Sequence, residues 1–121
     1  MARTLVVKAT AGSDEPERCA QAFTVAGTAA AAGVEVSLWL TGESAWFGLP
    51  GRAAEFDLPH SAPLPDLLDA VLASGGRVTV CTQCAARRGF GPDDVLPGVR
   101  IAGAAVFVEE IMADGVQALV Y

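Results

Sequence analysis

Positive charge is scarce in this chain of 121 residues. Eight lysines and arginines stand against fourteen aspartates and glutamates, so the formal net charge is −6. The phosphates of nucleic acids and of anionic membrane surfaces repel a protein of this charge. We therefore expect neither nucleic acid nor a membrane among its partners.

Long apolar runs are also missing. No stretch reaches the length that a membrane span needs, and residues 1–4 lead directly into a predicted strand rather than into a signal peptide. Three cysteines are too few for the disulfide framework of a small secreted protein. We expect a cytoplasmic protein whose thiols stay reduced.

Candidate ligands for a metal or a cofactor are few. The single histidine, His60, lies in the proline-rich stretch 50–65, which we interpret as an excursion over the surface. A zinc site needs more ligands than the two neighbouring cysteines, Cys81 and Cys84, can supply. The polar loop 10–14 has no phosphate-binding pattern and is shorter than a flavin loop. We expect neither a metal nor a diffusible cofactor.

Hydrophobic residues make up 52% of the chain and charged residues 18%, which predicts a compact, single domain over residues 1–121. Segments typical of strands alternate with segments typical of helices, which favours an α/β fold with a parallel sheet and right-handed crossovers. We expect one exposed face on the second strand because its residues alternate. The predicted strands are 4–9, 34–40, 77–81, 99–102 and 116–121, and the predicted helices are 16–32, a short one after Thr41, 65–74, a turn at 85–88, and 104–113.

The most informative stretch is Cys81-Thr82-Gln83-Cys84, where a predicted strand meets a predicted helix. Ligand sites of open α/β sheets gather at the carboxyl ends of strands, and the amino end of a helix stabilises a thiolate. We interpret Cys81 as a reactive thiol, although a strand-end cysteine can also simply fill space. A thioredoxin-like fold would place such a motif earlier in the chain. For Cys84, a resolving thiol and a packing residue remain equal alternatives.

Four further residues are candidates for anion binding beside Cys81. Arg87 and Arg88 follow the motif, and we expect one of them to face the site. Gly12 and Ser13 follow the first strand, so their backbone N–H groups should lie at the same edge of the sheet.

Three other residues have patterns that point to packing or to an interface. Trp46 and Phe47 follow the second strand outside any periodic stripe, and we expect them to line the cleft or a subunit interface, with a local core as the alternative. Cys19 lies on the apolar stripe of the first predicted helix, which indicates a core residue.

Residues 80–89, Val-Cys-Thr-Gln-Cys-Ala-Ala-Arg-Arg-Gly, resemble the signature of the DsrE/DsrF-like family, which includes the TusD-type sulfur-relay subunits. In that family a strand ends in a cysteine, a short helix follows, and an arginine pair and a glycine close the motif. The order of strands and helices agrees over essentially the whole chain.

The resemblance implies a flavodoxin-like three-layer sandwich with a mostly parallel sheet of about five strands flanked by helices, usually assembled as a trimer or hexamer. It also implies that Cys81 carries sulfane sulfur as a persulfide between a donor and an acceptor thiol. Cys84 departs from the family pattern, because sulfur-relay members usually have a small residue there.

These considerations predict a sulfurtransferase-type carrier or thiol-redox protein that acts through Cys81, with Cys84 as a possible resolving thiol. The alternative is a non-catalytic oligomeric module that binds a small ligand or a protein segment in the same cleft. Transfer of sulfur to Cys81 distinguishes the two.

Overall fold

The computed structural model, which describes residues 3–121, contains a five-stranded sheet in which all neighbouring strands are parallel. The strand order is β4-β3-β2-β1-β5. The strands are β1 (Thr4–Ala9), β2 (Glu35–Leu40), β3 (Arg77–Cys81), β4 (Val99–Ala102) and β5 (Val116–Val120).

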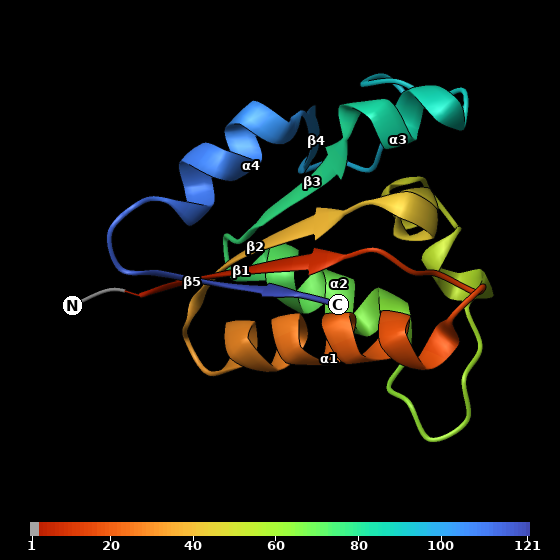
Figure 1. Cartoon of the computed structure of the whole chain (residues 1–121). Coiled ribbons are helices and arrows are strands. Elements are labelled where there is room, and N and C mark those ends of the chain that lie inside the picture. Colours follow the sequence, from red (N-terminus) through yellow and green to blue (C-terminus); the bar gives the residue numbers. More distant parts are fainter. Residues whose placement is uncertain (1–2) are drawn as a thin grey trace.

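Helices cover both faces of the sheet, as Figure 1 shows. The chain runs from β1 to β4 in one direction and then returns to β5 beside β1, so a right-handed return connection must cross the opposite face. α1 and α2 pack on one face, α4 lies on the other, and α3 follows the carboxyl end of β3 (Figure 1). The flavodoxin-like α/β sandwich expected from the sequence is confirmed. The helices are α1 (Pro16–Ala31), α2 (Leu64–Ala73), α3 (Thr82–Arg87) and α4 (Ala104–Ile111).

The main core lies between the sheet and the α1–α2 layer. Val36, Leu38 and Leu40 of β2 are buried on this side, and Phe23 of α1 is completely buried as well. Cys19 is 1% exposed within this core, as its place on the apolar stripe predicted. Burial raises the pKa of the Cys19 thiol to about 12, so this thiol stays protonated and unreactive.

The opposite face of the sheet, which we call the α4 face, carries polar and charged side chains. Successive strand residues point to opposite faces, and Lys8, Trp39, Thr79 and Arg100 form one row across β1, β2, β3 and β4. The prediction that β2 has an exposed face is wrong, because Ser37 is 0% and Trp39 2% exposed. Both are covered by a carboxylate from α4.

Most predicted boundaries agree with the structure to within two residues. The turn expected at 85–88 belongs to α3, which begins earlier, at Thr82. Residues 50–65 are more than a surface excursion, because a 3₁₀ turn at Ala53–Glu55 inserts Ala53 into the core. Among the described residues, no helix combines the length and apolar character needed to span a membrane.

Candidate functional site

Cys81 ends β3 and occupies the cap position immediately before α3. Alternation along β3 places its side chain on the α4 face, where it is partly exposed. There it lines a cleft of about 320 Å³ together with Lys8, Trp39 and Phe107. The cleft therefore joins the ends of β1, β2 and β3 to the first turn of α4.

The surroundings of Cys81 favour its ionised form. Burial alone would raise the pKa of this thiol, but hydrogen bonding from the backbone N–H and the thiol of Cys84, and from the backbone N–H of Gln83, outweighs burial. The positive charge of Lys8 acts in the same direction. The net result is a pKa below the ordinary value, so Cys81 has the character of a nucleophilic thiolate.

Cys84 has the opposite character. It is 8% exposed, and burial, together with the neighbouring Cys81, raises the pKa of its thiol. The backbone N–H of Gly42 donates a hydrogen bond of 3.2 Å to its Sγ. Gly42 has φ +53°, and a Cβ at this position would collide with the carbonyl oxygen of Thr10, so only glycine fits here without movement of the loop. Cys84 thus stays a protonated thiol beside Cys81.

The two arginines that follow the motif have different surroundings in the structure. Arg88 forms an ion pair of 2.6 Å with Glu43 and donates a hydrogen bond of 3.1 Å to the carbonyl oxygen of Cys84. Arg87 is exposed at the end of α3. Neither lines the cleft of Cys81, so the expectation that one of them faces the site is corrected. Arg88 instead fixes α3 to the segment that carries Glu43.

Gly12 and Ser13 do not form the opposite wall of the cleft either. The backbone N–H of Gly12 donates to the Asp14 carboxylate at 2.8 Å, and Gly12 is packed against the backbone of Glu43. Ser13 borders a separate hollow of about 210 Å³. The backbone N–H of Gly12 is thus already bonded to a carboxylate of its own loop.

The aromatic walls of the cleft are also different from those expected. Phe47 is 4% exposed and packs edge-on against Phe23 and Phe56, so it is a core residue, which was the alternative interpretation. Trp46 borders the separate hollow near Ser13 and stacks with Arg52. The cleft of Cys81 is lined instead by Trp39 and Phe107.

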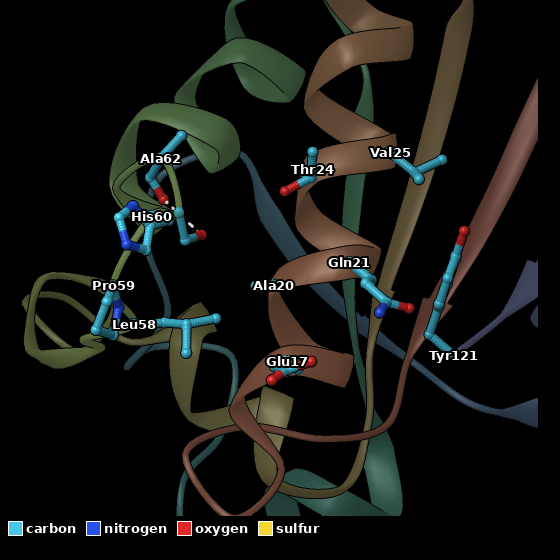
Figure 2. Close-up of a pocket in the computed structure, with 11 residues that line it drawn as sticks. Glu17, Ala20, Gln21, Thr24, Val25, Leu58, Pro59, His60, Ala62 and Tyr121 are labelled. Carbon is cyan, nitrogen blue, oxygen red and sulfur yellow. Dashed lines mark hydrogen bonds between the residues drawn. The ribbon is translucent and has the colours of Figure 1, made fainter.

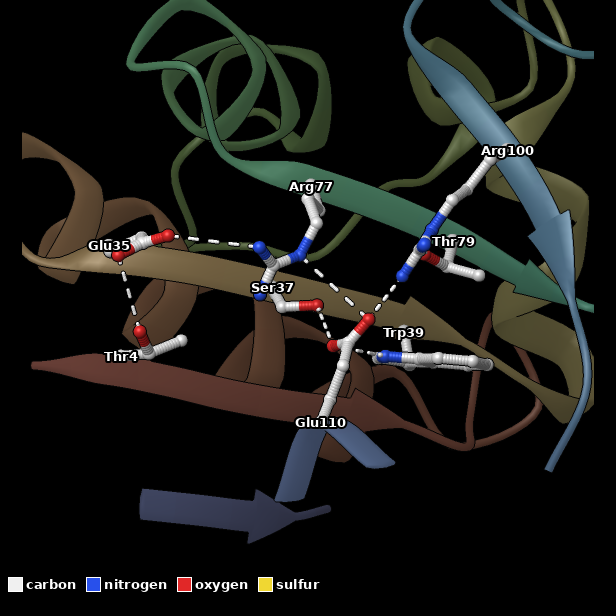
Figure 3. A network of polar contacts seen from close by, with 8 residues as sticks. All are labelled: Thr4, Glu35, Ser37, Trp39, Arg77, Thr79, Arg100 and Glu110. Carbon is white, nitrogen blue, oxygen red and sulfur yellow. Dashed lines mark hydrogen bonds and ion pairs between the residues drawn. The ribbon is translucent and has the colours of Figure 1, made fainter. Parts of the chain in front are cut away.

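A carboxylate from α4 holds Trp39, one of these two walls, in place (Figure 3). Glu110, one helical turn after Phe107, accepts hydrogen bonds from the Ser37 hydroxyl at 2.5 Å and from the Trp39 indole N–H at 3.1 Å. Its second oxygen pairs with Arg100 and lies 3.8 Å from Arg77. Burial would raise the pKa of Glu110, but these hydrogen bonds and the two arginines hold it below its ordinary value.

Other hollows lack a comparable set of groups. Figure 2 shows one of about 410 Å³ between α1 and the loop that carries His60. It contains no thiol, and among the residues the structure describes no three metal-ligating side chains gather closely enough to hold an ion. We therefore take the cleft of Cys81 as the candidate site.

Sequence reasoning identified Cys81 and Cys84 but missed Lys8, Trp39 and Phe107. Lys8 had a signal, since it is the single lysine of the chain and interrupts an otherwise apolar strand. No sequence pattern indicated Trp39 and Phe107, because these two residues meet only when α4 crosses back over the sheet. Their ring centroids are 5.2 Å apart.

Comparison with known proteins agrees with this architecture. The crystal structure of the YchN protein from E. coli matches with a TM-score of 0.78 at 18% sequence identity, over 100% of each chain. At this identity the similarity shows the fold alone. No curated protein sequence is similar enough to count as a relative. The sequence pattern of the DsrE/DsrF-like family, however, matches residues 4–120, and the chain therefore belongs to that family.

Proposed function

We propose that the protein is a sulfur carrier that holds sulfane sulfur as a persulfide on Cys81. The observation that supports this most strongly is the unequal pair of thiols at the end of β3, one with a lowered pKa in an open cleft and one buried with a raised pKa. Membership of the DsrE/DsrF-like family indicates a general role in sulfur relay or redox chemistry, in which members work with partner proteins.

The proposed step conserves atoms and charge. The Cys81 thiolate attacks the outer sulfur of a donor persulfide, R–S–SH, the S–S bond of the donor breaks, and R–S⁻ leaves. An acceptor thiolate then removes the outer sulfur from Cys81 in the same way and regenerates the Cys81 thiolate. The first exchange uses the Cys81 thiolate as the nucleophile and the second releases it as the leaving group, and surroundings that favour the thiolate assist both.

The raised pKa of Cys84 bears on the lifetime of the persulfide. If Cys84 attacked the inner sulfur of the Cys81 persulfide, a Cys81–Cys84 disulfide would form and HS⁻ would leave. A thiol that stays protonated attacks slowly, because the thiolate is the nucleophile. We infer that the protonated Cys84 leaves the sulfur on Cys81 at neutral pH and attacks the persulfide only under alkaline conditions, where its own thiolate forms. The reducing thiols of the cytoplasm, where we place the protein, fit this role.

Intact-mass measurement after incubation with a persulfide donor tests the proposal. We expect the reduced wild type to gain one sulfur atom and the Cys81→Ser variant to gain none. Cys84→Ser should still gain the sulfur and serves as the matched control. A wild type that gains no sulfur, or a Cys81→Ser variant that gains it equally, would refute the carrier and leave the non-catalytic binding module as the better description.

We also propose that the protein assembles with copies of itself, as a trimer or hexamer. The supporting observation is an apolar surface on α4 and on the edge strand β5, where Val108 is 52%, Met112 75%, Leu119 40% and Val120 64% exposed. β5 contains no charged residue, and an uncharged edge strand invites pairing with another chain. A second copy would cover both the edge and the apolar surface.

The Met112→Glu variant tests this assembly. A carboxylate placed in an apolar interface loses its hydration without gaining a partner, so we expect the oligomer to dissociate. Light scattering at working concentration should show a multimer for the wild type and a monomer for Met112→Glu. Thr28→Glu, on the exposed side of α1, should keep the wild-type mass. A wild type that is already monomeric contradicts the proposal.

A further inference from the structure

The side chain of Lys8 is an unneutralised cation inside the cleft of Cys81. Lys8 is the only lysine of an acidic chain, and its Nζ lies 5.0 Å from the centroid of the Phe107 ring. Five arginines pair with carboxylates, whereas no carboxylate of the described residues lies within ion-pair distance of Lys8. In a protein of net charge −6, such a cation attracts an anionic ligand.

One side of the cleft is apolar, whereas Thr41, Thr82 and Gln83 line the side next to Cys81. Trp39 and Phe107 meet edge to face, with an interplanar angle of 83°, and Gly103 and Ala104 complete the apolar side. Glu110 fixes the Trp39 indole through its N–H, so the pair of rings is held in one orientation. Rigid aromatic walls favour an apolar body in the bound molecule.

The size of the cleft limits what can enter. Its volume of about 320 Å³ is near the lower end of the range for small-molecule sites, about 300–1,000 Å³. A compact molecule with one charged end therefore fits the charge, the walls and the volume together, whereas a protein segment would need a longer groove.

We propose that the cleft binds a compact organic sulfur anion, with its apolar body against Phe107 and the exposed edge of Trp39 and its single negative charge beside Lys8. This inference rests on the proposed function and adds the chemical class of the sulfur donor to it. A thiosulfonate, R–SO₂–S⁻, is a donor of this class. An inorganic donor with two charges and no apolar body uses only part of the site.

The transfer from a thiosulfonate is balanced. The Cys81 thiolate attacks the terminal sulfur of R–SO₂–S⁻, and the bond between the two donor sulfurs breaks. The sulfinate R–SO₂⁻ leaves with the bonding electron pair, and the Cys81 persulfide anion remains, so two negative charges stand on each side. Lys8 reduces the repulsion between the attacking thiolate and the anionic donor.

Binding is tested without any sulfur transfer. Benzenesulfonate has the apolar body and the charge but no sulfur to give, and methanesulfonate has the charge alone. We expect benzenesulfonate, at a concentration well above its dissociation constant, to slow alkylation of Cys81 by iodoacetamide about tenfold, as followed by peptide mapping. Methanesulfonate at the same concentration should give little protection.

Two variants assign the contacts. Lys8→Met removes the charge and Phe107→Leu removes one ring, and each should abolish most of the protection by benzenesulfonate. Arg87→Met removes a positive charge outside the cleft and should leave the protection intact. Circular dichroism checks that each variant is folded. Baseline alkylation is measured for every variant without sulfonate, because Lys8 also affects the Cys81 thiol.

The outcomes separate this inference from the proposed function. Equal protection by both sulfonates, protection that persists in Lys8→Met, or no protection at all overturns the inference, whatever the persulfide assay shows. Selective protection by benzenesulfonate upholds the inference about the cleft even where Cys81 accepts no sulfur, a result that would overturn the carrier function alone.

Discussion

Replacing Glu110 by alanine is expected to lower the free energy of unfolding by about 3 kcal/mol. The substitution leaves the Ser37 hydroxyl and the Trp39 indole N–H, which are 0% and 2% exposed as residues, without an acceptor. An orphaned buried donor costs about 1–3 kcal/mol. The substitution of Glu110 also removes the carboxylate that Arg100 and Arg77 face. Since these arginine side chains are about 42% exposed, water compensates much of their loss.

Urea unfolding followed by tryptophan fluorescence measures this effect. Glu109→Ala changes the adjacent, exposed carboxylate and should alter stability by less than about 0.5 kcal/mol. Glu110→Gln keeps an acceptor for Ser37 or Trp39 but loses the charge, so its stability should fall between the wild type and Glu110→Ala. Equal stability of Glu110→Ala and Glu109→Ala would show that the hydrogen bonds and ion pairs of Glu110 do not stabilise the folded protein.

The pH dependence of the same measurement has a definite sign. The pKa of Glu110 is lower in the folded protein than the ordinary value of 4.5, so the folded state prefers the ionised carboxylate. The resulting stabilisation is fully present above that ordinary value and is lost as the pH falls through the lowered value of the folded state. The difference between wild type and Glu110→Gln should therefore be constant near neutral pH and shrink in acid.

Replacing Cys84 by alanine is expected to slow the alkylation of Cys81 at neutral pH, because the pKa of Cys81 should rise toward its ordinary value when the Cys84 thiol is lost. The Cys84 thiol is one of the groups that lower the pKa of Cys81, and alanine cannot donate a hydrogen bond. The backbone N–H groups at positions 83 and 84 remain, so part of the effect survives.

The rate of Cys81 alkylation across pH measures this shift. Cys84→Ser retains a hydroxyl donor and is expected to keep most of the wild-type reactivity, which separates hydrogen bonding from packing. An alkylation profile of Cys84→Ala that coincides with that of the wild type would mean that Cys84 only fills space beside α3.

Local sequence patterns predicted the order of strands and helices because each element ends at its own glycine, proline or polar loop. They failed on β2, where alternation indicated a solvent-exposed face. The Ser37 hydroxyl and the Trp39 indole are instead buried against Glu110, which lies 73 and 71 residues away in the chain. A buried polar group whose acceptor comes from a distant helix resembles an exposed one in sequence.

Prediction of the site from the sequence is limited in the same way. The position of Cys81 could be predicted because it depends on one strand and the helix that follows it directly. The cleft around it depends on the return of α4 across the sheet, which brings Phe107 against Trp39 and Lys8. Arg88 was assigned to the site from its nearness in sequence, but it is neutralised by Glu43. Nearness along the chain does not reveal which charges remain unpaired.

The single lysine of the chain allows the cleft to be labelled chemically. Side-chain amines occur nowhere else in the sequence, so Lys8, in the same cleft as the reactive thiol, is the one side chain that an amine-acylating reagent can modify besides the α-amino group of the chain. Acylation would replace a cation by a neutral, larger group beside Cys81. Once peptide mapping has distinguished Lys8 from the α-amino group, one amine-directed reagent would therefore label the cleft, and its effect on the thiol could be followed without mutagenesis.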